Sequence, residues 1–131
     1  MDGMSATGTF EIDSWEPQPP VADQDGIAIT QVTLRKTFHG DLTGTSVVYM
    51  TMGTTPVEES RTYVAIEHVT GELDGRKGSF LLQHTGISDE GEQSLRVSVV
   101  PDSGTGELTG LRGEMRIHIA PDGSHSYTFD R

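Results

Sequence analysis

A glutamate and a histidine lie on either side of a short turn in the segment 61–86, RTYVAIEHVTGELDGRKGSFLLQHTG. The dipeptide Asp74-Gly75 tolerates the left-handed backbone of a type I′ turn, so the segment is predicted to be a β-hairpin with a two-residue turn. The predicted register pairs Val69 with Phe80, Glu67 with Leu82 and Ala65 with His84. Because strand side chains alternate between faces, Glu67 and His84 are expected as diagonal neighbours on one face.

That face is otherwise apolar, and it also carries Tyr63, Phe80 and Leu82. A carboxylate and an imidazole are costly in such surroundings unless they pair with each other. Burial raises the pKa of a carboxyl group, whereas a neighbouring imidazolium lowers it, so the pair could act as an acid or base near neutral pH. The catalytic interpretation makes Glu67 the base or proton shuttle and His84 its orienting partner. In the alternative interpretation, the two side chains only bond to each other inside the protein and so fix the strand register.

Aromatic and apolar side chains supply the candidate ligand contacts. Tyr63 and Tyr127 could each donate a hydroxyl to a ligand oxygen, or they could pack with the hydroxyl at the surface. Trp15 is the single tryptophan and stands where the first strand meets a long loop, as a lid or as an anchor for the loop. Phe80 and Leu82 would line an apolar pocket. The chain has five histidines without close spacing and no cysteine, so no metal site and no cofactor are expected.

Composition indicates one acidic domain over residues 1–131. The net charge of −11, from 20 acidic and 9 basic residues, disfavours nucleic acid and anionic membrane surfaces as partners. No apolar run approaches the ~20 residues of a membrane span, and the first residues lack the pattern of a secretory signal. A cytoplasmic location is therefore expected.

Alternating apolar and polar residues predict an all-β fold. The predicted strands and hairpins cover residues 6–15, 27–38, 42–52, 61–85, 93–101, 112–120 and 124–130, joined mainly by short connections. Eight antiparallel strands in a meander must close or be covered, and eight close into a barrel that holds side chains or one small ligand. We therefore predict a single up-and-down β-barrel with a central cavity, in preference to a two-sheet sandwich. Residues 16–26, rich in Pro and Asp, are predicted as a loop over the barrel mouth.

Several sequence blocks resemble a bacterial domain-of-unknown-function family of small β-barrels. These blocks are ATGTFEIDSWE, VTLRKTFHGDLTG, AIEHVTG, GRKGSFLLQHTG and SGTGELTGLRGE. That family is related in fold to plant allene oxide cyclase, and more distantly to dirigent proteins and bacterial spirotetronate-type cyclases. The resemblance implies an eight-stranded antiparallel barrel with a central cavity, usually in an oligomer, so a homodimer or homotrimer is expected.

The resemblance also nominates two further polar residues. Residues 11–13 match the Glu-Ile-Asn cavity motif of allene oxide cyclase except at the last position, which implies Glu11 as a second catalytic carboxylate. A polar cavity position of that enzyme falls near Arg35, where an amide becomes a cation, and its cavity cysteine has no counterpart. Simple alternation instead turns Glu11 and Arg35 outward. Both can hold only if part of the apolar face lies outside, covered by a partner subunit.

The predicted function is the binding of a small apolar molecule that carries oxygen. Within that function, the resemblance favours a cofactor-free isomerisation or cyclisation, in which the barrel holds a flexible substrate in a reactive conformation. Two alternatives stay open: a non-catalytic carrier that is lipocalin-like in its physics, and a solidly packed interaction module.

Overall fold

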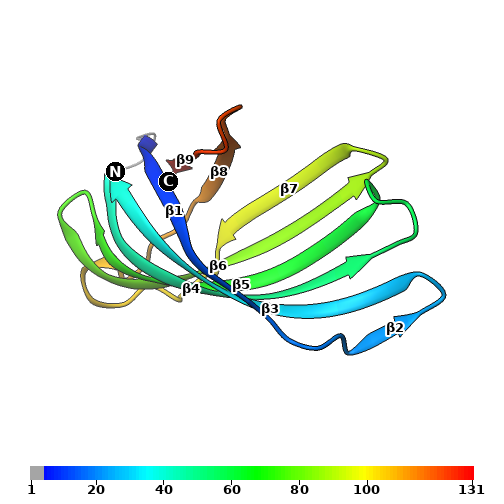
Figure 1. The fold of residues 1–131 in the computed structure, drawn as a ribbon. Coiled ribbons are helices and arrows are strands. Elements are labelled where there is room, and N and C mark those ends of the chain that lie inside the picture. Colours follow the sequence, from blue (N-terminus) through cyan, green and yellow to red (C-terminus); the bar gives the residue numbers. More distant parts are fainter. Residues whose placement is uncertain (1–4) are drawn as a thin grey trace.

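The computed structural model describes residues 5–131 as a closed eight-stranded antiparallel β-barrel with one additional strand, which confirms the predicted all-β barrel (Figure 1). The elements are β1 (Ser5–Pro17), β2 (Ala22–Gln24), β3 (Ile27–Gly40), β4 (Leu42–Thr54), β5 (Arg61–Leu73), β6 (Arg76–Asp89), β7 (Glu92–Val99), the 3-10 turn η1 (Gly106–Leu108), β8 (Glu114–Ile119) and β9 (His125–Asp130). Within these residues no helix is long or apolar enough to cross a membrane.

The sheet closes because β1 pairs on one side with β9 and on the other with β3. From β3 to β9 each strand pairs antiparallel with the next one along the chain, so the barrel has up-and-down topology. The additional strand β2 pairs with the start of β3 through a turn at Asp25 (φ 59°) and Gly26 (φ 78°). The expectation of a plain loop over residues 16–26 is therefore wrong in part, because Asp-Gly turns favour a hairpin here as well.

The central hairpin of β5 and β6 has the predicted register. Val69 pairs with Phe80, Glu67 with Leu82 and Ala65 with His84. Asp74 (φ 50°) and Gly75 (φ 82°) both adopt the left-handed conformation, as a type I′ turn requires. This turn fixes which side chains of the hairpin face the barrel interior.

The strands differ in length, and this difference divides the barrel into two halves. Strands β3 to β6 contain 13 or 14 residues, whereas β8 and β9 contain only 6. Beyond Val97–Met115 and Ser98–Glu114, no further residues of β7 and β8 pair within the described chain. Figure 1 shows β7 and β8 diverging from this point. One half of the barrel is therefore closed and the other is open on one side.

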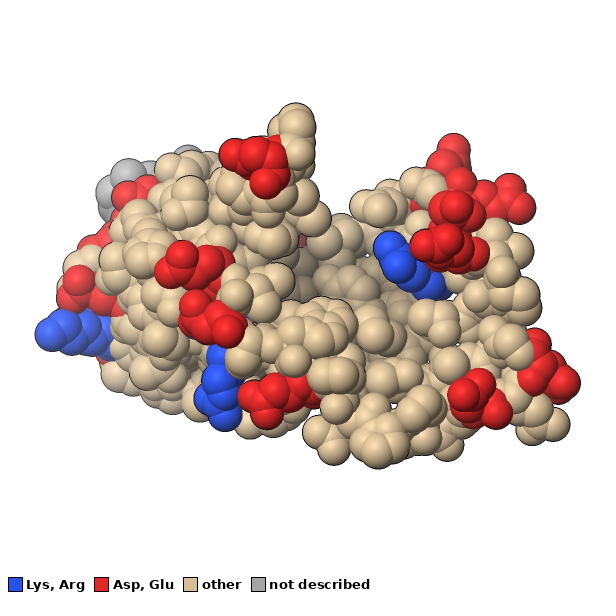
Figure 2. All heavy atoms as spheres, viewed as in Figure 1, with Lys and Arg blue, Asp and Glu red and all other residues tan. Residues whose placement is uncertain are grey.

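The closed half is filled by side chains. Its core contains Ala6, Phe10, Phe38, Leu42, Val69, Leu73, Phe80, Leu82, Val97, Val99, Leu108, Met115, Tyr127 and Phe129. In the open half a smaller apolar cluster, Val32, Leu34, Val48, Met50 and Ala65, lies on the inner face of β3 to β5. Figure 2 shows that the molecular surface is hollowed between the part formed by β6 and β7 and the part formed by β8 and β9. We call this hollow the open cup.

Candidate functional site

Four adjacent strands each contribute one polar side chain to the barrel interior, at the level where the two apolar clusters meet. Lys36 of β3, Ser46 of β4, Glu67 of β5 and His84 of β6 are all buried. They face inward because each lies two residues away from a buried apolar residue on its own strand, and alternate residues share a face. Four buried polar groups at one level require mutual hydrogen bonds to offset their lost hydration.

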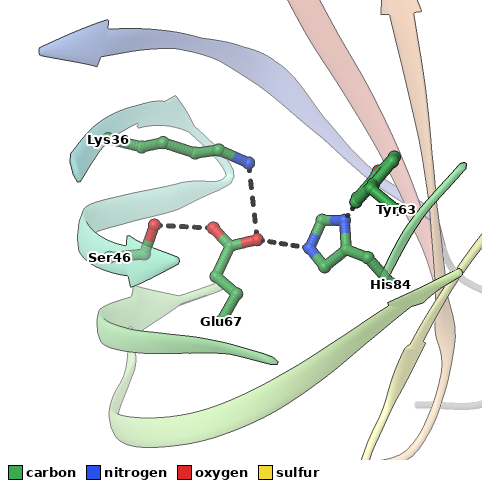
Figure 3. A network of polar contacts seen from close by, with 5 residues as sticks. All are labelled: Lys36, Ser46, Tyr63, Glu67 and His84. Carbon is green, nitrogen blue, oxygen red and sulfur yellow. Dashed lines mark hydrogen bonds and ion pairs between the residues drawn. The ribbon is translucent and has the colours of Figure 1, made fainter. Parts of the chain in front are cut away.

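The carboxylate of Glu67 is the centre of this network (Figure 3). One carboxylate oxygen, Oε1, lies 2.7 Å from Nε2 of His84 and 3.4 Å from Nζ of Lys36. The other oxygen, Oε2, accepts a 2.6 Å hydrogen bond from Oγ of Ser46. Lys36 also lies 4.6 Å from the centre of the Phe10 ring, within the range of a cation–π contact. The fully buried carboxylate is thereby satisfied at both oxygens.

These contacts set the protonation state of Glu67. Burial alone would raise the pKa of the carboxyl group, but the His84 hydrogen bond, the Lys36 charge and the Ser46 hydroxyl together lower it to about 2. The side chain is therefore ionised at neutral pH. Its pKa therefore lies well below neutrality, because the network stabilises the charged form more than burial penalises it.

Tyr63 extends the network toward the open cup. Its hydroxyl lies 3.3 Å from Nδ1 of His84, on the opposite side of the imidazole from Glu67. Because the ionised carboxylate accepts a hydrogen bond from Nε2–H, a neutral His84 leaves Nδ1 free to accept one from Tyr63. Burial and the nearby charge of Glu67 raise the pKa of Tyr63 to about 12, so its hydroxyl keeps its proton.

A glycine makes room for the Tyr63 ring. Gly86 pairs with Tyr63 across β5 and β6, and a Cβ atom at Gly86 would lie 2.7 Å from Cε1 of Tyr63 and 3.5 Å from Cδ1 of Leu95. The ring therefore lies over the glycine backbone, half-buried, with its hydroxyl directed at His84. Carboxylate, imidazole and phenol thus form a chain of hydrogen bonds that begins in the buried core and ends beside the open cup.

Comparison with known proteins places the chain in a family. Residues 6–130 match the model of the family described as "Protein of unknown function (DUF3224)". The chain belongs to the DUF3224 family. A crystal structure of a DUF3224 protein of unknown function from Shewanella oneidensis MR-1 is 44% identical in sequence, with a TM-score of 0.90, over 96% of this chain and 93% of that one. No curated protein matches.

In this DUF3224 barrel, three predicted ligand contacts lie in the closed half. Phe80 and Leu82 are fully buried, and the Phe80 ring stacks on Phe129 at 6.2 Å. The Tyr127 hydroxyl donates to the carbonyl oxygen of His39 at 3.0 Å and accepts from the Leu42 amide at 2.9 Å. The structure therefore does not bring these three side chains to the open cup: Phe80 and Leu82 belong to the core of the closed half, and Tyr127 joins β9 to the β3–β4 turn.

The two residues nominated by the resemblance alone lie outside the barrel. Glu11 is exposed and pairs at 3.0 Å with the exposed His39, and Arg35 is exposed on β3. Their predicted inward placement is wrong, because Phe10 and Lys36 occupy the inward positions next to them. Simple alternation, which turned both residues outward, describes these strands of the DUF3224 barrel.

Trp15 lies at the rim of the open cup. A β-bulge at Asp13 shifts the pairing of β1 with β3, so that Trp15 stands opposite the inward-facing Leu34. The indole remains half exposed. On the other side of the open cup, Leu95 of β7 is also exposed although it contacts the inner face at Gly86. Exposed apolar side chains therefore border the open cup on both sides.

Sequence reasoning missed Lys36 and Ser46. Their signal was present, because Lys36 shares its strand parity with Phe38 and Ser46 shares its parity with Val48. In the described part of the chain, no three His, Asp or Glu side chains are grouped in a way that could hold a metal ion. The polar site of this DUF3224 barrel thus consists of Lys36, Ser46, Glu67, His84 and Tyr63.

Proposed function

We propose that this chain binds a small apolar molecule that carries an oxygen atom, with the apolar part in the open cup and the oxygen at the Tyr63 hydroxyl. The observation that carries the proposal is the position of Tyr63. Its half-buried hydroxyl ends a hydrogen-bonded chain from the buried Glu67, and it does so where the filled half of the barrel gives way to the open cup. Concave apolar sites with a few fixed polar groups are the usual form of small-molecule sites.

The physical chemistry of the open cup favours such a ligand. The exposed rim residues Trp15 and Leu95, and the partly buried Met52 that packs against the inner apolar cluster, gain free energy when a ligand removes them from water, at roughly 25 cal/mol per Å² of apolar surface. Tyr63 retains its proton to high pH, so its hydroxyl can turn from the 3.3 Å contact with His84 and donate to a ligand oxygen throughout the physiological range. The ionised Glu67 is fully bonded within the barrel, so the site offers a ligand no free carboxylate.

A second candidate, a cofactor-free isomerase or cyclase, is favoured by the order of groups in the chain from Glu67 to Tyr63. A phenol backed by an imidazole and a carboxylate can lend a proton to a ligand oxygen in the transition state and take it back afterwards. In this arrangement Glu67 orients His84, and Tyr63 is the group that would touch the substrate. The resemblance of the sequence blocks to allene oxide cyclase supports this candidate only as an analogy of fold.

The binding proposal is tested with the fluorescence of Trp15, the single tryptophan, as a reporter at the rim. The probes are a medium-chain methyl ketone and the alcohol and alkane of equal chain length. The wild type should bind all three, with the oxygenated probes bound more tightly. Tyr63→Phe should weaken the binding of the oxygenated probes by about three- to tenfold, which corresponds to the loss of one hydrogen bond, and should leave the affinity for the alkane unchanged.

Tyr49→Phe is the matched control, because it removes a hydroxyl from the exposed outer face of β4. It should bind all three probes as the wild type does. An unchanged Trp15 signal with every probe would reject the binding proposal. The enzyme candidate is tested separately, by product analysis with an epoxide or enone of the same chain length. Turnover that survives Tyr63→Phe would exclude Tyr63 as the proton donor.

A further inference from the structure

The central part of the outer face of β3 to β6, between Glu72 at one end and Asp89 at the other, lacks carboxylates in a chain that is otherwise rich in them. Strand pairing arranges sixteen outward positions of this face as four rows of four: Ile29–Gly53–Thr62–Ile87, Gln31–Thr51–Val64–Thr85, Thr33–Tyr49–Ile66–Gln83 and Arg35–Val47–His68–Leu81. None of the sixteen is Asp or Glu, although the chain has 20 acidic residues among 131. Arg35 is the single Lys or Arg among them. We call these sixteen positions the neutral face.

The neutral face is also apolar at its centre. Tyr49 pairs directly with Ile66, and Val64 lies two residues along from Ile66 on the same strand. These side chains are 60% (Tyr49), 43% (Ile66) and 50% (Val64) exposed. Single exposed apolar residues are ordinary on a protein surface, but contiguous apolar groups without charge mark interaction sites.

We propose that the neutral face is the interface of a two-fold symmetric homodimer, with the Tyr49–Ile66 pair near the symmetry axis. In such an interface the same patch meets itself, so a carboxylate near the axis would face its own copy. Two chains that each carry a net charge of −11 repel one another. A face free of carboxylates is where this repulsion between the two chains is weakest. A partner recognised by charge would instead be bound by acidic or basic side chains.

The dimensions of the neutral face suit this partner. Four strands about 4.8 Å apart and seven residues at about 3.3 Å each span roughly 20 Å by 20 Å. Side-chain relief enlarges this plane, and the row Thr37–Thr45–Thr70–Ser79 continues it along the same four strands, up to the Asp13 carboxylate that accepts a 2.6 Å hydrogen bond from Thr37. A specific interface buries about 800 Å² on each partner, which such an area can approach. Two sheets that pack face to face, about 10 Å apart, give a common type of contact.

The test is the mass of the full chain in solution, measured by sedimentation over a concentration series. The wild type should approach twice the chain mass of 14.2 kDa. Ile66→Lys should raise the dimer dissociation constant by at least ~100-fold, since two buried like charges would meet near the axis. Ile119→Lys is the matched control, because Ile119 is apolar and 68% exposed but lies on β8, outside the neutral face. It should leave the dimer intact.

A charge-reversal experiment separates a specific interface from general loss of solubility or folding. Ile66→Lys and Ile66→Glu should each be monomeric, and an equimolar mixture of the two should recover a heterodimer, because opposite charges then face each other. A monomeric wild type at all concentrations would overturn the proposal. So would a dimer that persists in both single variants, or one that Ile119→Lys disrupts equally.

Discussion

Oε1 of Glu67 lies 2.7 Å from Nε2 of His84, and both residues are inaccessible to solvent. The same oxygen lies 3.4 Å from Nζ of Lys36, so one atom bonds two cationic or potentially cationic side chains. A buried charge pair contributes little net stability compared with apolar residues, but the loss of one partner leaves the other charged and unpaired. The Glu67 network is therefore a place where single substitutions should cost more than double ones.

Glu67→Gln should lower the free energy of unfolding by about 3–5 kcal/mol, because it leaves the Lys36 charge buried without a counter-charge. Urea denaturation at neutral pH measures this change. Glu58→Gln, at an exposed glutamate in the β4–β5 loop, should change stability by no more than ~0.5 kcal/mol. The double variant Lys36→Met, Glu67→Gln should regain part of the loss. If the double variant is as unstable as the sum of the two single variants, the pair is not coupled.

Stability should also fall in acid through this carboxylate. The folded pKa of Glu67, about 2, is below the ordinary value of 4.5, so protonation favours the unfolded chain. The stabilisation is complete above pH 4.5 and is lost as the pH falls toward 2, by about 3 kcal/mol in total. Urea denaturation at a series of pH values measures it. The double variant Lys36→Met, Glu67→Gln should show a flatter profile over this range, and an equally steep one would assign the acid sensitivity to other groups.

The sequence predicted the hairpin of the site because two independent signals agree there. The Asp74-Gly75 turn fixes the register, and alternation then places Glu67 and His84 on one face. The prediction missed the two other partners of Glu67, Lys36 and Ser46, because a lysine is seldom buried and Lys36 gives no signal of its own beyond its strand parity. Without Lys36 and Ser46 the pKa of Glu67 could not be derived, since burial alone would have raised it.

The open cup could not be predicted because it depends on how strands of unequal length meet. The predicted final strand 124–130 is shorter than the others, but the divergence of the final pair of strands from β7 depends on packing across the barrel. The β-bulge at Asp13 was equally hidden, and it decides that Trp15 lies opposite Leu34. A one-residue irregularity reverses the facing of every later side chain on a strand, so alternation in the sequence could not show which way Trp15 faces.

Gly86→Ala should displace the Tyr63 ring, because the new methyl group would lie within 3.0 Å of two ring carbons. The hydroxyl should then lose its contact with His84 and become more exposed to water, which removes part of the burial that raises the pKa of Tyr63 to about 12. A spectroscopic titration of tyrosinate should therefore show one tyrosine ionising closer to the ordinary value of 10.0. The preference for the ketone over the alkane should fall as it does in Tyr63→Phe.

Gly53→Ala is the control for this substitution. Its added methyl group meets only the Thr62 side chain on the outer face, at 3.2 Å. Tyrosine ionisation and probe preference should match the wild type in this variant. If Gly86→Ala leaves both quantities unchanged while the barrel stays folded, the ring does not need the glycine, and the Tyr63–His84 contact is set by other residues.

The backbone of β7 should exchange its amide hydrogens unevenly. The Val99 amide donates to the Gly113 carbonyl at 2.9 Å, so odd-numbered residues of β7 direct their N–H groups toward β8. The described pairing with β8 ends at Val97, which leaves the amides of Gln93 and Leu95 facing the divergence. Hydrogen exchange followed by NMR should find that these two amides exchange fast and that the Val99 amide exchanges slowly.

Because Leu95 borders the open cup, a ligand that draws β7 and β8 together should slow the exchange of the Leu95 amide selectively. Slow exchange at Leu95 in the free protein would mean that β7 and β8 also pair beyond Val97 in solution, and that a ligand cannot enter between these two strands.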